Sequence, residues 1–255
     1  MATDSPATAD RTARSAIRAF LGAVGVAFGA LVLGSVLVAV SAVALSAFGI
    51  ALLSNPSLQI LVSVVGVQGV AFGGTALLYL RYRGRGLSFL RARFPTLRDV
   101  GWMLGGFLLL FGLLVVVGRL FTALGIESAQ NQVVALGSSD PTVFLLMIPL
   151  SFLLVGPSEE LLFRGLVQGR LAEAFSPARA IVLASAIFAV VHYTSLAGSG
   201  RFAYIGVVFA LALVLGVVYE RTDNLVVPAL IHGAYNAVQF AIQYLAATGG
   251  LPPVS

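Results

Sequence analysis

The sequence predicts an all-α protein, a polytopic transmembrane helical bundle of about seven spans, or eight if residues 18–53 form two spans. Of its 255 residues, 59% are hydrophobic and only 10% are charged, whereas soluble domains contain about 25% charged residues. Several apolar runs reach the roughly 20 residues that a helix needs to cross a bilayer. The chain contains no cysteine, which excludes disulfides and thiolate chemistry.

Apolar runs separated by polar connections define the expected spans. They cover residues 18–53, 58–80, 101–124, 141–171, 177–193, 203–219 and 225–246. The run that begins at residue 18 is too long for the core of a signal peptide, which has roughly 7–15 apolar residues, so we expect it to be retained as a span.

Every basic residue is an arginine, and the net charge is +5. Arginines occur in the connections 81–98, 172–179 and 220–224, which the positive-inside rule assigns to the cytoplasm. We expect a multi-pass protein of a prokaryotic cell membrane. The arginine clusters are short and flank apolar runs, so they predict contact with membrane lipids and no binding of nucleic acid.

The domain organisation follows from these runs. Residues 1–17 form a polar N-terminal tail, and residues 18–140 form the N-terminal transmembrane helices. Residues 141–247 form a helical core that carries the chemistry, and residues 248–255 form a short tail. The sequence gives no oligomeric state.

Ionisable residues in the apolar core are the main functional signal. Glu159, Glu160 and Arg164 follow an uncharged apolar stretch, and His192 and His232, the only histidines, lie in later apolar runs. A charge inside a bilayer is costly, so such residues face a protein interior or a wet cavity. We therefore expect these five side chains to have a specific role.

Helix geometry predicts that these residues meet. Glu159 lies about fifteen residues before the turn between the fourth and fifth spans, and His192 about sixteen after it, which places them at a similar height at 1.5 Å per residue. His232 lies about nine residues after the next cytoplasmic turn, roughly 14 Å up. We expect a common depth on the cytoplasmic side of the bilayer centre, so that the site opens toward the cytoplasm.

The spacing also divides the carboxylates between two tasks. Glu160 and Arg164 are four residues apart, so they share a helix face and suit an ion pair. Glu159 is rotated by about 100° from Glu160, which leaves it free to face a cavity as a general base. A neutral His192 can share the water that Glu159 deprotonates.

An amide and an imidazole form the second predicted pair. His232 and Asn236 are four residues apart on one helix face and can donate hydrogen bonds to a developing oxyanion. Together with Glu159 and His192, they supply the groups needed to hydrolyse an amide bond. Phe188 and Tyr235 are interpreted as packing residues.

Two other classes of function remain open at this point. The polar residues can be interhelical hydrogen-bonding groups in a membrane scaffold or immunity protein without proteolytic activity. Glu159 can instead be the proton site of a proton-coupled transporter.

Three motifs resemble those of the CPBP family, the CAAX-prenyl-protease and bacteriocin-processing (Abi) intramembrane proteases. The motifs are Glu159-Glu160-x-x-x-Arg164, Phe188-x-x-x-His192 and His232-x-x-x-Asn236, in order and in separate helices. The resemblance covers roughly residues 141–245 and implies an α-helical membrane endopeptidase. Eukaryotic members remove the last three residues of prenylated CAAX proteins, so the implied substrate is a peptide or protein, with or without a lipid.

The resemblance also implies roles for the motif residues. Glu159 and His192 are similar to the pair that activates water, and His232 and Asn236 to the oxyanion-stabilising pair. Glu160, Arg164 and Phe188 are supporting residues. The family has been described both as metalloproteases and as glutamate proteases. With zinc, the ligands would be Glu159, His192 and His232, although the spacing is not of the HExxH type. We favour a glutamate mechanism that requires no metal or other cofactor.

Overall fold

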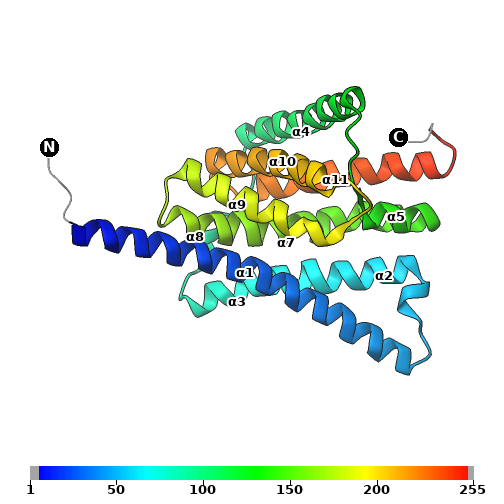
Figure 1. Ribbon diagram of the computed structural model, residues 1–255, viewed down its shortest axis with the longest axis horizontal. Coiled ribbons are helices and arrows are strands. Elements are labelled where there is room, and N and C mark those ends of the chain that lie inside the picture. The colour runs from blue at the N-terminus through cyan, green and yellow to red at the C-terminus, as the bar shows by residue number, and fades with distance from the viewer. Residues whose placement is uncertain (1–5, 252–255) are drawn as a thin grey trace.

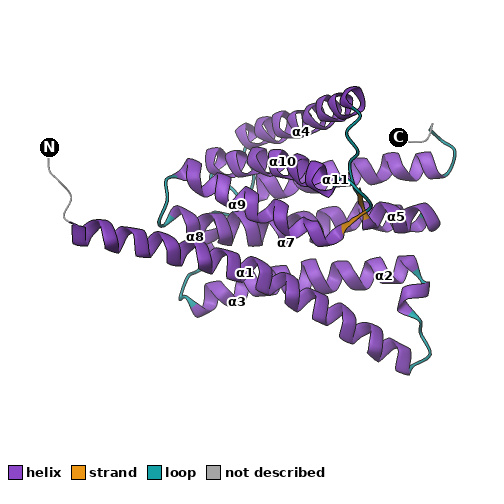
Figure 2. Ribbon diagram, in the orientation of Figure 1, coloured by secondary structure: helices purple, strands orange, loops and turns teal. Residues whose placement is uncertain are grey.

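Six helices in the computed structural model, which describes residues 6–251, are long and apolar enough to cross a membrane. They lie roughly along one axis of an all-α bundle, which confirms the predicted fold class (Figures 1 and 2). The α-helices are α1 (Pro6–Ala47), α2 (Pro56–Ser63), α3 (Gly74–Tyr82), α4 (Leu97–Leu124), α5 (Gln132–Ser139), α6 (Thr142–Leu150), α7 (Gly156–Glu160), α8 (Gly169–Ala172), α9 (Pro177–Val191), α10 (Arg201–Thr222) and α11 (Val226–Ala247). The 3-10 turns are η1 (Leu52–Ser54), η3 (Leu87–Leu90) and η6 (His192–Ser195), and the π-helical segments are η2 (Val64–Gly73), η4 (Ser151–Val155) and η5 (Leu161–Gln168).

The first predicted span is one helix. The stretch Arg14–Ala47 is a single helix that is long and apolar enough to cross a membrane, so residues 18–53 do not form two spans. The expected polar tail at 1–17 is helical from Pro6 onward, in keeping with the preference of proline for the first turn of a helix. Residues 1–5 and 252–255 lie outside the described part of the chain, so only part of each predicted tail can be compared.

The last predicted span is present as a helix of 22 residues, α11. It is not among the six helices that are apolar enough to span, because it carries His232, Asn236, Gln239 and Gln243. The count of seven spans therefore stays a prediction.

A composite helix from Thr142 to Ala172 occupies the centre of the bundle. It consists of α6, η4, α7, η5 and α8, and it contacts α11, α9, η2 and α1. Pro149 and Pro157 lie on either side of η4. Proline removes a backbone donor and crowds the preceding turn, which explains why the helix departs from α geometry here. Such π segments are frequent at functional sites.

Two glycines allow α7 and α11 to approach closely. A Cβ atom at Gly156 would lie 2.7 Å from the Ala229 carbonyl oxygen, and one at Gly233 would lie 2.9 Å from the Ser151 carbonyl oxygen. Both contacts are with backbone atoms, which cannot move aside as a flexible side chain can. The pair of glycines thus sets the distance between the helix with the two glutamates and the helix with His232.

The start of α11 is held by the connection before α4. Arg91 pairs with Asp223 at 2.8 Å and with Glu220 at 3.3 Å, and its guanidinium lies 4.1 Å from the centre of the Tyr219 ring. The Leu225 amide donates to the Arg91 carbonyl at 3.1 Å. These contacts fix the turn from which α11 rises toward the centre of the bundle.

Two short strands, β1 (Gln130–Asn131) and β2 (Leu196–Ala197), form an antiparallel ribbon that the sequence did not predict (Figure 2). Gln130 pairs with Ala197, and Asn131 pairs with Leu196. The ribbon thus connects Leu196–Ala197, which follow the turn that begins at His192, to the connection after α4 by backbone hydrogen bonds.

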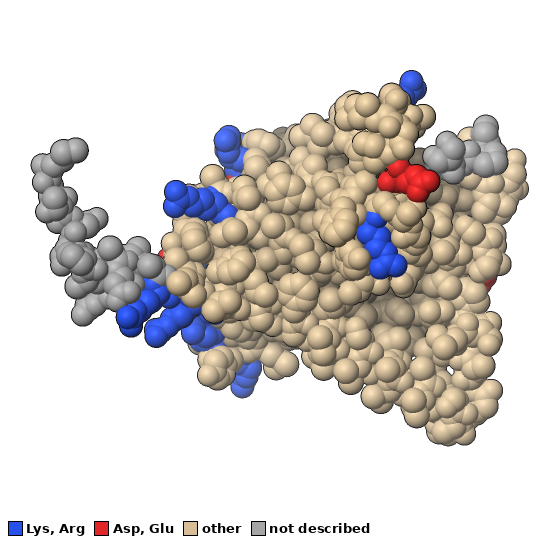
Figure 3. Space-filling view, in the orientation of Figure 1, with Lys and Arg blue, Asp and Glu red and all other residues tan. Residues whose placement is uncertain are grey.

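Arginine side chains gather at the end of the molecule where the N-terminal part of α1 and the turn between α8 and α9 lie (Figures 1 and 3). The sequence predicts a cytoplasmic location for the arginine-containing connections, and this orientation stays a prediction.

Candidate active site

Buried ionisable groups from the central helix form the core of the site. Glu159 and Glu160 end α7, and Arg164 lies one turn further on, in η5. Glu159 is 4% exposed, and Glu160 and Arg164 are fully buried. Buried charges persist in proteins when they are paired, so each group needs a partner among its neighbours.

Glu159 lies between histidines from two other helices. Its Oε2 atom is 3.8 Å from Nε2 of His192, at the end of α9, and 3.9 Å from Nε2 of His232 in α11. These distances exceed that of a direct hydrogen bond. The structure thus brings Glu159, His192 and His232 together.

Glu160 connects His232 to Arg164. Nδ1 of His232 lies 2.9 Å from Oε1 of Glu160, and Nε of Arg164 lies 3.2 Å from Oε2. The second contact is an ion pair without the alignment of a hydrogen bond. The expected Glu160–Arg164 pair is therefore present, but Glu160 also binds His232, which the spacing did not predict.

Phe188 is the packing surface for this cluster. Its ring centre lies 4.4 Å from that of His192 and 4.9 Å from that of Phe163, and the Arg164 guanidinium lies 4.7 Å from the ring. A second guanidinium contact is the bond from Arg164 to the Ala212 carbonyl at 3.3 Å. The Phe188 ring thus packs against His192 and also stabilises the positive charge of Arg164.

The tautomer of His192 follows from its backbone partner. Nδ1 lies 2.7 Å from the Phe188 carbonyl oxygen, and because a carbonyl can only accept, Nδ1 carries the proton. In the neutral ring, Nε2 then presents a lone pair toward Glu159. His192 is the more accessible histidine, with 21% of its side chain exposed compared with 10% for His232.

Asn236 lies on α11 one turn after His232 and is partly buried. Within the described residues, no hydrogen bond joins it to the glutamates or to the histidines. Tyr204 of α10 also lies near the site, close enough to interact electrostatically with Glu159.

Gln68 is a further polar contact of the site that was not expected from the sequence. It lies in η2, and its Nε2 atom donates to Oε1 of Glu159 at 3.5 Å. The only available signal was a single amide in an otherwise apolar segment. Nothing in the sequence links that amide to a carboxylate 91 positions away.

The three side chains named for a zinc site are of suitable types. Both histidines have Nδ1 occupied by an oxygen partner and Nε2 directed to Glu159, as is common among zinc ligands. In the described part of the chain, however, no group of three or more His, Cys, Asp or Glu side chains is gathered as a metal site requires. This geometry does not fit a metal, so no chemical step is derived through one.

The fold and this cluster define a class of protein: a multi-pass α-helical membrane protein whose core holds carboxylates, imidazoles and a guanidinium from different helices. Residues 141–238 match the family model described as Rce1-like, type II CAAX prenyl endopeptidase Rce1-like. The match covers less than half of the chain, and it confirms the resemblance seen in the motifs. The segment contains every predicted site residue, but not Gln68. No curated protein and no solved structure matches the chain.

Proposed function

We propose that the protein is an intramembrane endopeptidase that uses Glu159 to activate water. The single observation that carries the proposal is the position of this buried carboxylate. It lies within 4 Å of two imidazoles, and the three side chains come from different helices of the matched family segment. Few structural roles require so many titratable groups in one buried place.

The first step is water activation. A water between Oε2 of Glu159 and Nε2 of His192 donates one hydrogen bond to each, since both atoms present lone pairs. Glu159 removes one proton while the oxygen attacks the carbonyl carbon of the substrate. Gln68 holds the other carboxylate oxygen at 3.5 Å, which orients Glu159.

The second step requires donors for the oxyanion. Nδ1 of His232 faces Glu160 at 2.9 Å, so a protonated His232 directs an N–H from Nε2 into the site. With His232 protonated, the charges of Glu159, Glu160, Arg164 and His232 sum to zero, which suits a buried cluster. Asn236 is the second donor in this scheme.

The third step is release of the amine. Glu159, which then carries the proton taken from water, donates it to the leaving nitrogen as the carbon–nitrogen bond breaks. The products are a new carboxyl terminus and a free amine, and the enzyme returns to its starting protonation state. All atoms come from the substrate and one water molecule, so no cofactor is needed in this scheme.

The proposed substrate is a peptide or protein, with or without an attached lipid, cut near the cytoplasmic leaflet. The arginine-rich end of the molecule supports this orientation. Zinc on Glu159, His192 and His232 stays the alternative to this scheme, although these side chains are not gathered as a metal site requires in the described part of the chain.

Cleavage of quenched fluorescent peptides, prenylated and not, by the purified protein tests the proposal. We expect Glu159→Gln and His192→Ala to reduce cleavage by at least about 10²-fold, the range for removing a general base. Glu173→Gln, a change at an exposed carboxylate, is the matched control and should cleave as wild type does. The wild-type activity should persist in a chelator, whereas recovery by added zinc would indicate a metalloprotease.

Other outcomes of this assay distinguish the other classes. A wild-type protein that cleaves no peptide, and whose folding is unchanged by Glu159→Gln, would favour a scaffold. A proton-coupled transporter would show pH-dependent uptake in proteoliposomes that Glu159→Gln shifts.

A further inference from the structure

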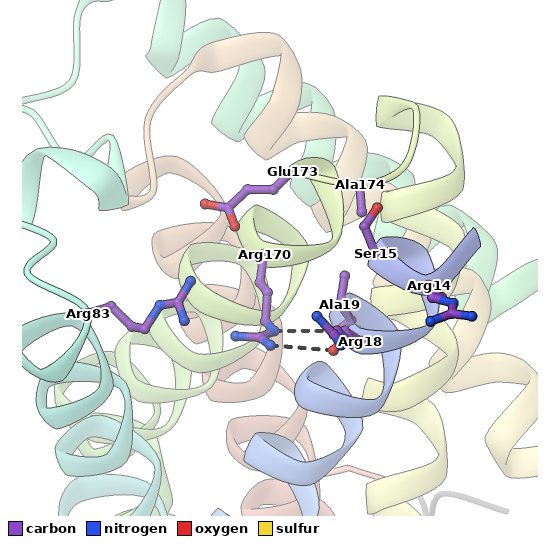
Figure 4. A pocket seen from close by; sticks show the side chains of 8 residues that line it. All are labelled: Arg14, Ser15, Arg18, Ala19, Arg83, Arg170, Glu173 and Ala174. Atoms are coloured by element: carbon purple, nitrogen blue, oxygen red, sulfur yellow. Dashed lines mark hydrogen bonds between the residues drawn. The ribbon is translucent and has the colours of Figure 1, made fainter. Parts of the chain in front are cut away.

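A basic cavity lies at the arginine-rich end, apart from the candidate active site. Its volume is about 490 Å³, and it is open to the surface. The lining comes from the N-terminal part of α1, the end of α3 and the turn after α8 (Figure 4). The lining residues are Arg14, Ser15, Arg18, Ala19, Arg83, Arg170, Glu173 and Ala174.

Arg170 is held in a fixed position at this cavity. Its guanidinium donates to the carbonyl oxygens of Ala19 at 3.3 Å and Arg18 at 3.4 Å, both on α1 (Figure 4). It also lies 5.5 Å from the centre of the Tyr79 ring. A Cβ atom at Gly22 would overlap this guanidinium, so the glycine provides the space in which Arg170 sits.

The positive charge of the cavity is not neutralised by its own carboxylate. Glu173 already forms an ion pair with Arg85, which is not a lining residue. Among the residues described, no carboxylate pairs with Arg18 or Arg83. The cavity therefore combines the guanidinium of Arg170, which α1 holds, with those of Arg18 and Arg83, and it carries an excess of positive charge.

We propose that this cavity binds an anionic phosphate group, and that its source is the headgroup of an anionic phospholipid. Guanidinium groups recognise phosphate oxygens through paired N–H donors. Basic pockets between transmembrane helices, on the side that faces the cytoplasm, suit such headgroups. Here the arginines come from α1 and α3, at the ends of two membrane-spanning helices, where a headgroup lies.

This site is distinct from the proposed catalytic site. Among the residues described, Arg18, Arg83 and Arg170 form no hydrogen bond or ion pair with Glu159, His192 or His232, and the inference does not depend on proteolysis. A bound lipid would join α1, which lies outside the matched family segment, to α8 inside it.

Native mass spectrometry of the full-length protein in a neutral detergent tests the proposal. The probes are phosphatidylglycerol and phosphatidylcholine with the same acyl chains, and inorganic phosphate is titrated separately by calorimetry. We expect phosphatidylglycerol to bind more tightly than phosphatidylcholine. Arg18→Gln and Arg83→Gln should each weaken it about fivefold, and the double variant about 25-fold. Arg98→Gln, an exposed arginine at the start of α4, is the charge-matched control and should bind as wild type does.

Gly22→Ala provides a second variant that keeps every charge. It displaces the end of the Arg170 side chain while leaving the helix intact, so it should also weaken phosphatidylglycerol binding. Inorganic phosphate that binds as tightly as the lipid would support the phosphate site and identify free phosphate as its source. Equal binding of the two lipids, equal loss in Arg98→Gln, or wild-type affinity in Gly22→Ala and Arg18→Gln would overturn the proposal.

Discussion

Glu160→Gln is the change whose effect can be worked out most fully from the structure. The substitution keeps the shape of the side chain and removes its charge. It leaves the fully buried guanidinium of Arg164 without the carboxylate that lies 3.2 Å away. It also removes the anionic partner of Nδ1 of His232 at 2.9 Å.

The expected loss of stability is large. Breaking a buried ion pair from one side costs about 3–5 kcal/mol, because the remaining charge has no compensation. Arg164→Met should cost less, because Glu160 keeps His232 as a partner. The double variant should recover much of the loss, since replacing both charges by neutral groups is often close to neutral. The two changes should therefore be coupled by about 2–3 kcal/mol.

Unfolding in increasing concentrations of a denaturing detergent gives the free energies for this double-mutant cycle. Peptide cleavage gives a second readout, and the double variant should stay inactive even though it is stable, because His232 has lost its anionic partner. If the losses of the two single variants simply add in the double variant, the ion pair does not have the energetic role assigned to it here.

Three other changes have defined outcomes. Gly156→Ala should destabilise the protein by about 1–3 kcal/mol through overpacking against α11, and it should abolish cleavage. Gly105→Ala is the control, because a Cβ atom there meets no other group, and it should change neither stability nor cleavage. Equal effects of the two variants would contradict the close approach of α7 and α11. Phe188→Ala should lower the free energy of unfolding by about 3–5 kcal/mol. If this variant cleaves peptides as fast as wild type, the Phe188 ring is not needed to position His192. Hydrogen bonds to the carboxylate, the strongest of them from the Ser57 hydroxyl, lower the pKa of Asp140. The ionised Asp140 therefore contributes its full stabilisation above about pH 4, and this stabilisation is lost as the pH falls through the lowered pKa. Ser57→Ala should thus be less stable than wild type near neutral pH, and the difference, followed by thermal unfolding, should vanish in strong acid.

The main features of the fold could be predicted because a bilayer imposes simple requirements. The apolar runs ending near Leu124 and Ala172 match helices in the structure closely. The meeting of Glu159 with His192 followed from a hairpin of two helices and a constant rise per residue. These inferences needed only length, hydropathy and turn positions, which a sequence displays directly.

Other features depend on tertiary contacts that a sequence does not display. The bond between Glu160 and His232 requires the close approach of α7 and α11, which two glycines permit. The contact of Gln68 with Glu159 depends on how η2 packs on the central helix. The two-stranded ribbon of β1 and β2 joins distant parts of the chain. Each strand is too short to show the alternation of apolar and polar residues by which a strand is recognised in a sequence.

The π-helical segment η5 has a consequence for how this chain can tolerate insertions and deletions. A π segment accommodates more residues per turn than the surrounding α-helix, so it changes the direction in which the side chains after it point. Deleting one residue between Gly165 and Gln168 would favour regular α geometry, and because a π turn holds about one residue more than an α turn, the later side chains would keep nearly their present direction. Adding one residue in α geometry would instead rotate every later side chain by about 100° relative to the two glutamates. Arg170, which contacts α1, would then point away from it. An insertion in this short segment would therefore uncouple the two ends of the central helix, whereas the loss of one residue would leave them aligned.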